Sequence, residues 1–238
     1  MLKLIERPFV SLQGEGIQSG KRTCFIRLAG CNLRCSFCDT KYSWEEGSEV
    51  SEEEIWTEVR RLPQTTWICI TGGEPLLQDL ERLLDVIYRR SKGRKAVSIE
   101  TNGTIIPNGG WLNFIDLLTI SPKMTNSGMK DRWEEGTLSA LIWRYRGVRR
   151  QLKFVCQTVD DIWEAISLLN EMKVHIRSAF LEMPIIIQPD GNVEGQTPEG
   201  YWRTYKNFWE FVSHQELPFD LRVLPQLHRV IYGTRRGV

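Results

Sequence analysis

The sequence predicts an α/β fold in which a mostly parallel sheet is covered by helices, as in (β/α) barrels. Short runs rich in Ile, Val, Leu and Phe alternate along the chain with segments of helical periodicity, an alternation typical of parallel sheets. The chain has 238 residues, a length at which such barrels form one unit. No internal repeat or linker divides it. We therefore expect a single domain over residues 1–238.

Seven segments are predicted as strands, and three helices have readable starts. The strand candidates are residues 23–28, 66–71, 96–100, 117–121, 152–156, 184–188 and 220–224. Ser51 and Glu54 predict a capping box at the start of one helix, and Thr158 with Asp161 predicts the same before a second. Asp79 precedes the third, whose apolar residues at 80, 83, 84 and 87 repeat at helical spacing.

The composition gives no indication of a nucleic-acid or membrane partner. The net charge is +1, which provides no attraction for a polyanion. No apolar run approaches the roughly twenty residues of a membrane span, and the N-terminus lacks the apolar core of a signal peptide. We expect a cytoplasmic protein.

Three cysteines, Cys31, Cys35 and Cys38, lie in one eight-residue segment. Clusters of the four-iron, four-sulfur (4Fe-4S) type are usually held by four thiolates, so three would leave one iron open to another ligand. A zinc site is the alternative, but it would need a further Cys or His pair at close spacing, and the histidines are isolated and far downstream. The other cysteines are expected to be small core residues; they are Cys24, Cys69 and Cys156.

The Cys-x3-Cys-x2-Cys spacing, with Phe37 before the last cysteine, resembles the signature of the radical S-adenosylmethionine (SAM) superfamily. The resemblance implies an α/β fold of the superfamily's type, a modified, incomplete (β/α) barrel. It implies that the open iron chelates the amino and carboxylate groups of SAM. It implies too that an electron from the reduced cluster cleaves SAM to a 5′-deoxyadenosyl radical. We therefore expect an electron donor such as flavodoxin or ferredoxin, and a reducing compartment.

Polar or glycine-rich segments end three further strand candidates. Gly72-Gly73-Glu74-Pro75 follows residues 66–71, Glu100 ends the next candidate, and Ser121-Pro122-Lys123 ends the one after. Each segment has an alternative reading as a helix cap or a turn. Because loops at the carboxyl ends of barrel strands build the active site, we expect them to surround the cysteine loop. The first segment resembles the superfamily's Gly-Gly-Glu-Pro element, which holds the amino group of SAM.

Longer motifs narrow the family. Residues 12–16 (LQGEG), 38–40 (CDT) and 119–123 (TISPK) together closely resemble the 7-carboxy-7-deazaguanine synthase family, and similar segments continue to residue 228. The resemblance implies a carbon–nitrogen lyase of 7-deazapurine (queuosine precursor) biosynthesis. Its reaction would be the radical ring contraction of 6-carboxy-5,6,7,8-tetrahydropterin to 7-carboxy-7-deazaguanine, with release of ammonia. We also expect a homodimer.

The resemblance implies roles for individual residues. Cys31, Cys35 and Cys38 would hold the cluster, and Thr40 would bind Mg²⁺. The residues implied for SAM are Phe37, Cys38, Asp39, Gly73, Glu74, Ser121, Pro122, Lys123 and Gln188. Those implied for the substrate are Leu12, Gln13, Gly14, Glu15, Arg27, Thr71, Glu100 and His228. No residue is assigned as acid or base, and the sequence does not rank Asp39, Glu15 and His228 as groups that move protons.

Some of these roles have a basis in residue type. Arg27 offers a planar guanidinium that can pair bidentately with a substrate carboxylate, unless its side chain points outward. Gln13 offers a donor and an acceptor to the amide edge of a pterin. Thr40 supplies one oxygen to Mg²⁺, which commonly keeps waters and takes other oxygens from substrate. Without the resemblance, Thr40 would be interpreted as a helix cap.

Two other functions fit the cysteine motif. A radical-generating activase acts on a glycine of another protein, and it would have no use for Arg27, Gln13 and a magnesium ligand around a small carboxylate. An iron–sulfur electron carrier or sensor would need a fourth ligand and no Gly-Gly-Glu-Pro loop. The expected mechanism is hydrogen-atom abstraction from C6 of the pterin followed by rearrangement, in which the protein mainly positions groups and excludes water.

Overall fold

The computed structural model describes residues 1–107, 110–132, 134–180, 183–191 and 197–233. Its strands form one sheet in the order β10-β9-β8-β7-β6-β5-β3-β1-β4, with β2 paired to β3. From β3 through β5 to β10 every neighbouring pair is parallel, whereas β1, β2 and β4 pair antiparallel. The sheet curves without closing, so the predicted α/β fold with an incomplete barrel is confirmed.

All seven predicted strands are present. They are β3 (Arg22–Leu28), β5 (Trp67–Gly72), β6 (Ala96–Thr101), β7 (Leu117–Ile120), β8 (Arg149–Cys156), β9 (Ile185–Pro189) and β10 (Leu221–Val223). Three short strands were not predicted, namely β1 (Leu2–Leu4), β2 (Phe9–Leu12) and β4 (Ser48–Val50). β1 and β4 extend the sheet beyond β3, and β2 pairs with β3 outside this strand order.

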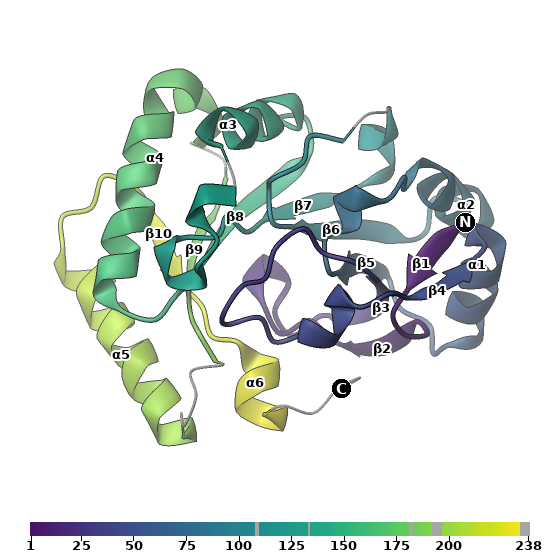
Figure 1. The fold of residues 1–238 in the computed structure, drawn as a ribbon, viewed down its shortest axis with the longest axis horizontal. Helices are drawn as coiled ribbons and strands as arrows, with labels where there is room; N and C mark the ends of the chain where they lie inside the picture. The colour runs from purple at the N-terminus through teal and green to yellow at the C-terminus, as the bar shows by residue number, and fades with distance from the viewer. Residues whose placement is uncertain (108–109, 133, 181–182, 192–196, 234–238) are drawn as a thin grey trace.

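The first five α-helices lie outside the curved sheet. The α-helices are α1 (Glu52–Arg61), α2 (Glu81–Ser91), α3 (Glu135–Arg144), α4 (Val159–Phe180), α5 (Pro198–His214) and α6 (Leu227–Tyr232). Figure 1 shows α3, α4 and α5 beside the β8–β10 end and α1 and α2 beside β1 and β4. The 3-10 helices are η1 (Gly16–Gln18), η2 (Lys41–Trp44), η3 (Pro75–Leu77), η4 (Trp111–Phe114), η5 (Thr125–Ser127) and η6 (Lys130–Arg132). In the described part of the chain, no helix is both long and apolar enough to cross a membrane.

The predicted helix starts are explained by specific hydrogen bonds. The Ser51–Glu54 capping box is confirmed, because each side chain bonds the backbone of the other residue. Asp161 accepts from the Thr158 backbone N–H at 2.9 Å, which is the acidic half of the second box. Asp79 accepts from the Glu81 N–H at 3.0 Å, and α2 begins at Glu81.

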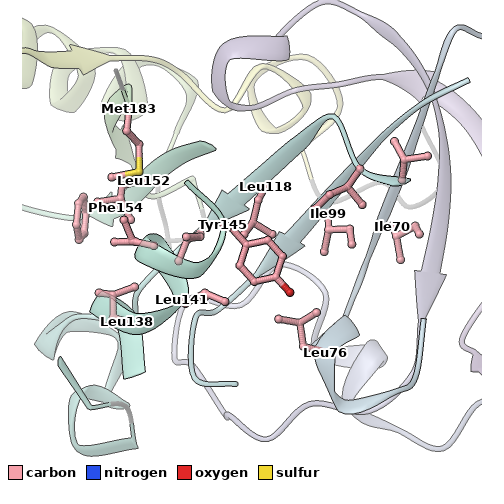
Figure 2. Packing of buried hydrophobic residues seen from close by; sticks show 14 of the residues in the cluster. Ile70, Leu76, Ile99, Leu118, Leu138, Leu141, Tyr145, Leu152, Phe154 and Met183 are labelled. Carbon is pink, nitrogen blue, oxygen red and sulfur yellow. The ribbon is translucent and has the colours of Figure 1, made fainter. Parts of the chain in front are cut away.

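The two faces of the sheet differ in polarity because side chains alternate along each strand. Ile70, Ile99 and Leu118 are in register on neighbouring strands, and Figure 2 shows them side by side, with Leu76 and Tyr145 in the same buried cluster. The opposite face carries polar side chains, and those that line the barrel interior are Arg27, Thr71, Glu100, Ser121 and Lys153. A continuous apolar core under the helices thus leaves a polar surface inside the barrel.

Candidate active site

The polar inner face ends in a cavity of about 240 Å³ at the carboxyl ends of the parallel strands. Its wall is built by the N-terminal segment before β3, the loop after β3, the ends of β5 to β8 and the residues around the start of α6. This is the position at which α/β barrels place their active sites.

The cysteine loop forms one side of the cavity. Cys31, Cys35 and Cys38 all line it, and none is in a disulfide. Burial raises the pKa of the Cys31 and Cys35 thiols, so both would need a cation such as iron to hold them as thiolates. The remaining cysteines are buried and do not line the cavity; they are Cys24, Cys69 and Cys156. Three thiols that converge on one space fit a cluster with one open iron.

Residues that alternate with the cysteines anchor this loop to its surroundings. Asn32 donates to the Thr104 hydroxyl at 2.8 Å and accepts from the Asn102 side chain at 2.9 Å. On the other side, the Ser36 N–H donates to the Ser127 carbonyl at 3.0 Å. These anchors were not predicted, since nothing in the local pattern of residues indicates which distant loops the cysteine loop contacts.

Gly72 and Gly73 line the cavity, where β5 ends against the cysteine loop. A Cβ on Gly73 would collide with the Gly30 carbonyl, and one on Gly72 would collide with the Leu28 carbonyl. Gly72 also has a φ of 137°, which side chains other than glycine rarely adopt. The two glycines therefore permit the close approach of the two loops.

Glu74 is fully buried and does not line the cavity. Its carboxylate accepts from the Leu76 N–H at 2.9 Å, the Thr101 hydroxyl at 2.8 Å and the Asn102 N–H at 2.7 Å. Burial raises its pKa in spite of these three donors. Glu74 thus joins the start of η3 to the end of β6, and its predicted contact with SAM stays a prediction.

Gln188 provides an independent test of whether a polar cofactor fits here. It is fully buried, and neither of its side-chain polar atoms has a partner among the described residues. It is in register with Val155, which lines the cavity, so its side chain lies on the inner face. Buried amides are normally hydrogen-bonded, so an unpartnered one beside the cavity fits a bound ligand with polar groups. Near it, Lys123 donates to the Ser121 hydroxyl at 2.9 Å and lies 5.8 Å from the Phe37 ring centroid.

Gln13, Thr71 and Glu100 form a connected set on the far side of the cavity. Both Gln13 and Thr71 donate to the Glu100 carboxylate, at 3.0 and 2.9 Å. The Gln13 side-chain oxygen accepts from the Glu15 N–H at 3.2 Å. These bonds fix the orientation of the Gln13 amide, which presents defined polar edges to a ligand.

Arg27 extends from β3 into the cavity wall, so the alternative prediction, that its side chain points outward, is wrong. Its Nε donates to the Glu6 carboxylate at 2.7 Å, and its guanidinium lies 5.7 Å from the Phe9 ring centroid. Among the described residues this is the one hydrogen bond that Arg27 makes, so both Nη groups remain available to a ligand.

Glu15 and Lys153 form a buried ion pair at the base of the site. Burial acts to raise the pKa of Glu15, but the charges of Lys153 and His228 lower it to about 2. Burial acts to lower the pKa of Lys153, yet Glu15 and Glu100 raise it above its ordinary value. Gln226 donates to the second Glu15 oxygen at 2.8 Å. The pair is therefore fully charged at neutral pH.

His228 and Asp39 complete the charge arrangement. His228 Nε2 lies 3.4 Å from the Asp39 carboxylate and 4.0 Å from Glu15. Burial opposes both charges, but the bond between them lowers the pKa of Asp39 and raises that of His228. One ligand atom each from Glu15, Asp39 and His228 lies within 4.8 Å of the others.

Thr40 lies next to this cluster and lines the cavity. It stands at the N-cap position of η2 but its side chain makes no capping hydrogen bond. Its hydroxyl is 3.7 Å from the Cys38 sulfur. The interpretation of Thr40 as a side-chain cap is therefore wrong, and its hydroxyl faces the site.

The structure brings most of the predicted site residues to one cavity. Those that line it are Leu12, Gln13, Gly14, Glu15, Arg27, Cys31, Cys35, Phe37, Cys38, Asp39, Thr40, Thr71, Gly73, Glu100, Ser121, Lys123 and His228. Glu74, Pro122 and Gln188 do not line it. Lys153, Tyr42 and Gln226 line it and were missed. The signal that could have indicated Lys153 is that it is the one charged residue in the predicted strand 152–156, whose other residues are apolar.

Comparisons with known proteins identify the family. Residues 25–192 match the family model of the radical SAM superfamily. The 7-carboxy-7-deazaguanine synthase of Pyrobaculum aerophilum is 31% identical, over 96% of this chain and 94% of that protein. That of Bacillus cereus is 32% identical, over 96% and 95%. The chain belongs to the 7-carboxy-7-deazaguanine synthase family.

A solved member of this family has the same fold. The crystal structure of QueE from Escherichia coli superposes with a TM-score of 0.64 at 26% identity, and the match covers 94% of each chain. The chain is thus a radical SAM enzyme, and membership in the 7-carboxy-7-deazaguanine synthase family sets aside the activase and the electron carrier.

Proposed function

We propose that this enzyme converts 6-carboxy-5,6,7,8-tetrahydropterin to 7-carboxy-7-deazaguanine with release of ammonia, using a 4Fe-4S cluster, SAM and Mg²⁺. The observation that carries the proposal is one cavity with three cysteine thiols on one side and the open Nη groups of Arg27 on another. A small anionic ring system fits between them. When bound, the cluster and SAM supply the radical chemistry that begins at C6 of the pterin.

The cofactor residues support this assignment by their placement. Cys31, Cys35 and Cys38 would each bind one iron. Gly73, through its backbone, and Ser121, Lys123 and Gln188 would surround SAM. The unpartnered Gln188 amide is the strongest support, because a buried amide without partners is costly unless a ligand supplies them.

The substrate residues hold the pterin by charge and orientation. Both Nη groups of Arg27 would donate to the two oxygens of the substrate carboxylate, a planar pairing that a lysine cannot reproduce. Gln13, fixed by Glu100, would bind the amide edge of the pterin together with the backbone of Leu12 and Gly14. These fixed groups would select one orientation of the substrate in the cavity.

His228 is the group best suited to donate a proton. Glu15 and Asp39 have lowered pKa values and are ionised at neutral pH, whereas the pKa of His228 is raised. A protonated His228 lies within 3.4 Å of Asp39, which holds the ring in place. We therefore assign His228, ahead of Glu15 and Asp39, to proton delivery during loss of ammonia.

The magnesium site would combine Thr40 with oxygens of the substrate. The Thr40 hydroxyl is not used as a cap and faces the cavity. The nearby carboxylates of Glu15 and Asp39 already form ion pairs with Lys153 and His228, respectively. A substrate carboxylate therefore adds the negative charge that a divalent cation requires, and Mg²⁺ should bind together with substrate.

The remaining proposals concern the cellular setting. We propose a homodimer. A location in the cytoplasm, with single electrons supplied by flavodoxin or ferredoxin, is consistent with a cluster that needs a reducing compartment. A single domain over residues 1–238 is consistent with the one continuous sheet.

The decisive experiment is an anaerobic assay of reconstituted enzyme with SAM, Mg²⁺ and the carboxypterin, followed by mass spectrometry. We expect 7-carboxy-7-deazaguanine and one equivalent of ammonia per turnover. Cleavage of SAM without that product, by enzyme with an intact cluster, would contradict the proposed substrate.

A further inference from the structure

The outer face of the cysteine loop carries an arginine whose bonds return to the loop itself. Along residues 31–38, Leu33, Cys35 and Phe37 are buried, whereas the residues between them are exposed. Arg34 is one of these exposed residues. Its guanidinium donates to the Cys31 carbonyl at 2.6 Å and to the Leu33 carbonyl at 2.8 Å, both through Nη1.

Two further contacts fix Arg34 in place. The guanidinium carbon lies 5.2 Å from the centroid of the Trp44 ring, in the range of a cation–π interaction. The Arg34 N–H donates to the Met129 sulfur at 3.3 Å. Trp44 is the last residue of η2, and Met129 lies between η5 and η6, so the arginine connects three segments that surround the cysteines.

The bonds of Arg34 determine where a neighbouring N–H points. Along the chain, the Leu33 N–H stands between the Cys31 and Leu33 carbonyls, both of which accept from Arg34. This N–H donates to the Cys31 sulfur at 3.4 Å. This segment belongs to no helix or strand, so no regular ladder fixes these peptide groups. An N–H directed at a cysteine sulfur stabilises the thiolate and raises the reduction potential of a cluster.

We infer that Arg34 is a positioning residue that holds the cysteine loop in its cluster-binding conformation and directs the Leu33 N–H at the Cys31 sulfur. The inference rests on the proposed cluster site at Cys31, Cys35 and Cys38. Arg34 touches neither cluster nor substrate, and it acts through the loop backbone. Its loss should loosen the loop even in protein without a cluster, and should also lower the reduction potential once the cluster is present.

The chain contains a matched control. Arg146 is also exposed, lies 4.6 Å from the centroid of the Trp143 ring and donates to the Trp143 carbonyl at 3.1 Å. It precedes the start of β8, so it lies at the opposite end of the strands from the cysteine loop. A general effect of removing a surface arginine from a tryptophan should appear equally in both variants.

The test compares Arg34→Gln, Arg34→Lys and Arg146→Gln. In cluster-free protein, hydrogen exchange of loop 31–38 should be about tenfold faster or more in Arg34→Gln, because the variant loses both hydrogen bonds from the guanidinium to the loop carbonyls. In reconstituted protein, iron loss to a chelator should accelerate similarly, and the cluster's midpoint potential should fall. Arg34→Lys keeps the charge, but its side chain ends one atom short of Nη1 and lacks the planar group that lies over the Trp44 ring, so it should resemble Arg34→Gln in exchange. Arg146→Gln should match the wild type in all three measurements.

Wild-type exchange, iron loss and potential in Arg34→Gln would overturn the inference, as would equal changes in Arg146→Gln. If Arg34→Gln fails to fold, as judged by circular dichroism, Trp44→Leu tests the same positioning role by removing the ring that the Arg34 guanidinium contacts. Wild-type enzyme that holds a cluster but makes no 7-carboxy-7-deazaguanine would contradict the proposed function and leave the inference about Arg34 intact.

Discussion

The positive charge of Lys153 lies inside the protein, where water does not solvate it. Glu15 lies 138 residues earlier in the chain, and the sequence carries no sign that the two side chains meet. The sequence motifs predicted Glu15 and the other residues of the N-terminal segment, because they stand in a recognisable run. They did not predict Lys153 or Glu6, whose importance depends on contacts made only after the sheet forms.

Lys153→Met should lower the free energy of unfolding by about 3 to 5 kcal/mol, because it leaves the buried carboxylate of Glu15 without its partner. Urea denaturation measures the loss. The double variant Glu15→Gln, Lys153→Met removes both charges and should regain much of the stability. A single variant as stable as the wild type would show that water solvates Glu15.

Arg27→Lys should keep the cluster and slow uncoupled cleavage of SAM while losing most product formation. A point charge cannot replace the two parallel bonds of the guanidinium, and loss of such a pair costs about 2 to 5 kcal/mol, hence roughly thirtyfold or more in turnover. Anaerobic assays of product and of SAM cleavage separate the two effects. Unchanged turnover would remove Arg27 from the site.

Thr40→Ala should weaken the response of chelator-treated enzyme to added Mg²⁺, whereas Thr40→Ser should retain it, since the hydroxyl is the proposed ligand. Magnesium affinity, measured by calorimetry, should be far higher with substrate present than without it. Equal affinity in both states, or full magnesium-dependent activity in Thr40→Ala, would contradict this role.

At the scale of elements, the sequence was most informative where neighbouring residues carry a strong local pattern. The seven parallel strands and the helix starts at Ser51 and Asp79 were predictable, because short runs rich in Ile, Val, Leu and Phe indicate strands and capping residues indicate helix starts. The strands β1, β2 and β4 were missed because they pair antiparallel, outside the strand–helix alternation from which the parallel strands were predicted. Their pairing is non-local, as with Leu2 and Val50, so local propensity cannot reveal it.

The contact between the end of β5 and the cysteine loop leads to a prediction about both elements. Gly73→Ala should displace the loop, because the new Cβ would collide with the Gly30 carbonyl. We expect lower thermal stability of the cluster-free protein and poor iron incorporation on reconstitution. Gly147→Ala is the control, since a Cβ there has open space around it. Normal iron content in Gly73→Ala would show that the loops separate without cost.

At the scale of the whole molecule, one cluster of charged and polar side chains joins the N-terminal segment and the start of α6 to strand β8. Glu15 comes from the N-terminal segment, Lys153 from β8 and Gln226 from the residue before α6. The sheet itself is open, so these side chains, and not a closing strand, hold the start of α6 against the N-terminal segment. The Leu227 N–H adds a backbone bond to the Gly14 carbonyl at 3.0 Å.

This arrangement predicts a defined pH dependence of stability. Because folding lowers the pKa of Glu15 from 4.5 to about 2, its contribution is present above pH 4.5 and is lost as the pH falls towards 2. Folding raises the pKa of His228 above 6.5, so its contribution is present below that pH and is lost as the pH rises through the raised value. Both contributions coexist between about pH 4.5 and 6.5. Urea denaturation at a series of pH values should therefore show the greatest difference in stability between wild type and Glu15→Gln in that window. A difference that does not shrink on acidification below pH 4.5 would show that the Glu15 carboxylate is not stabilised by its partners.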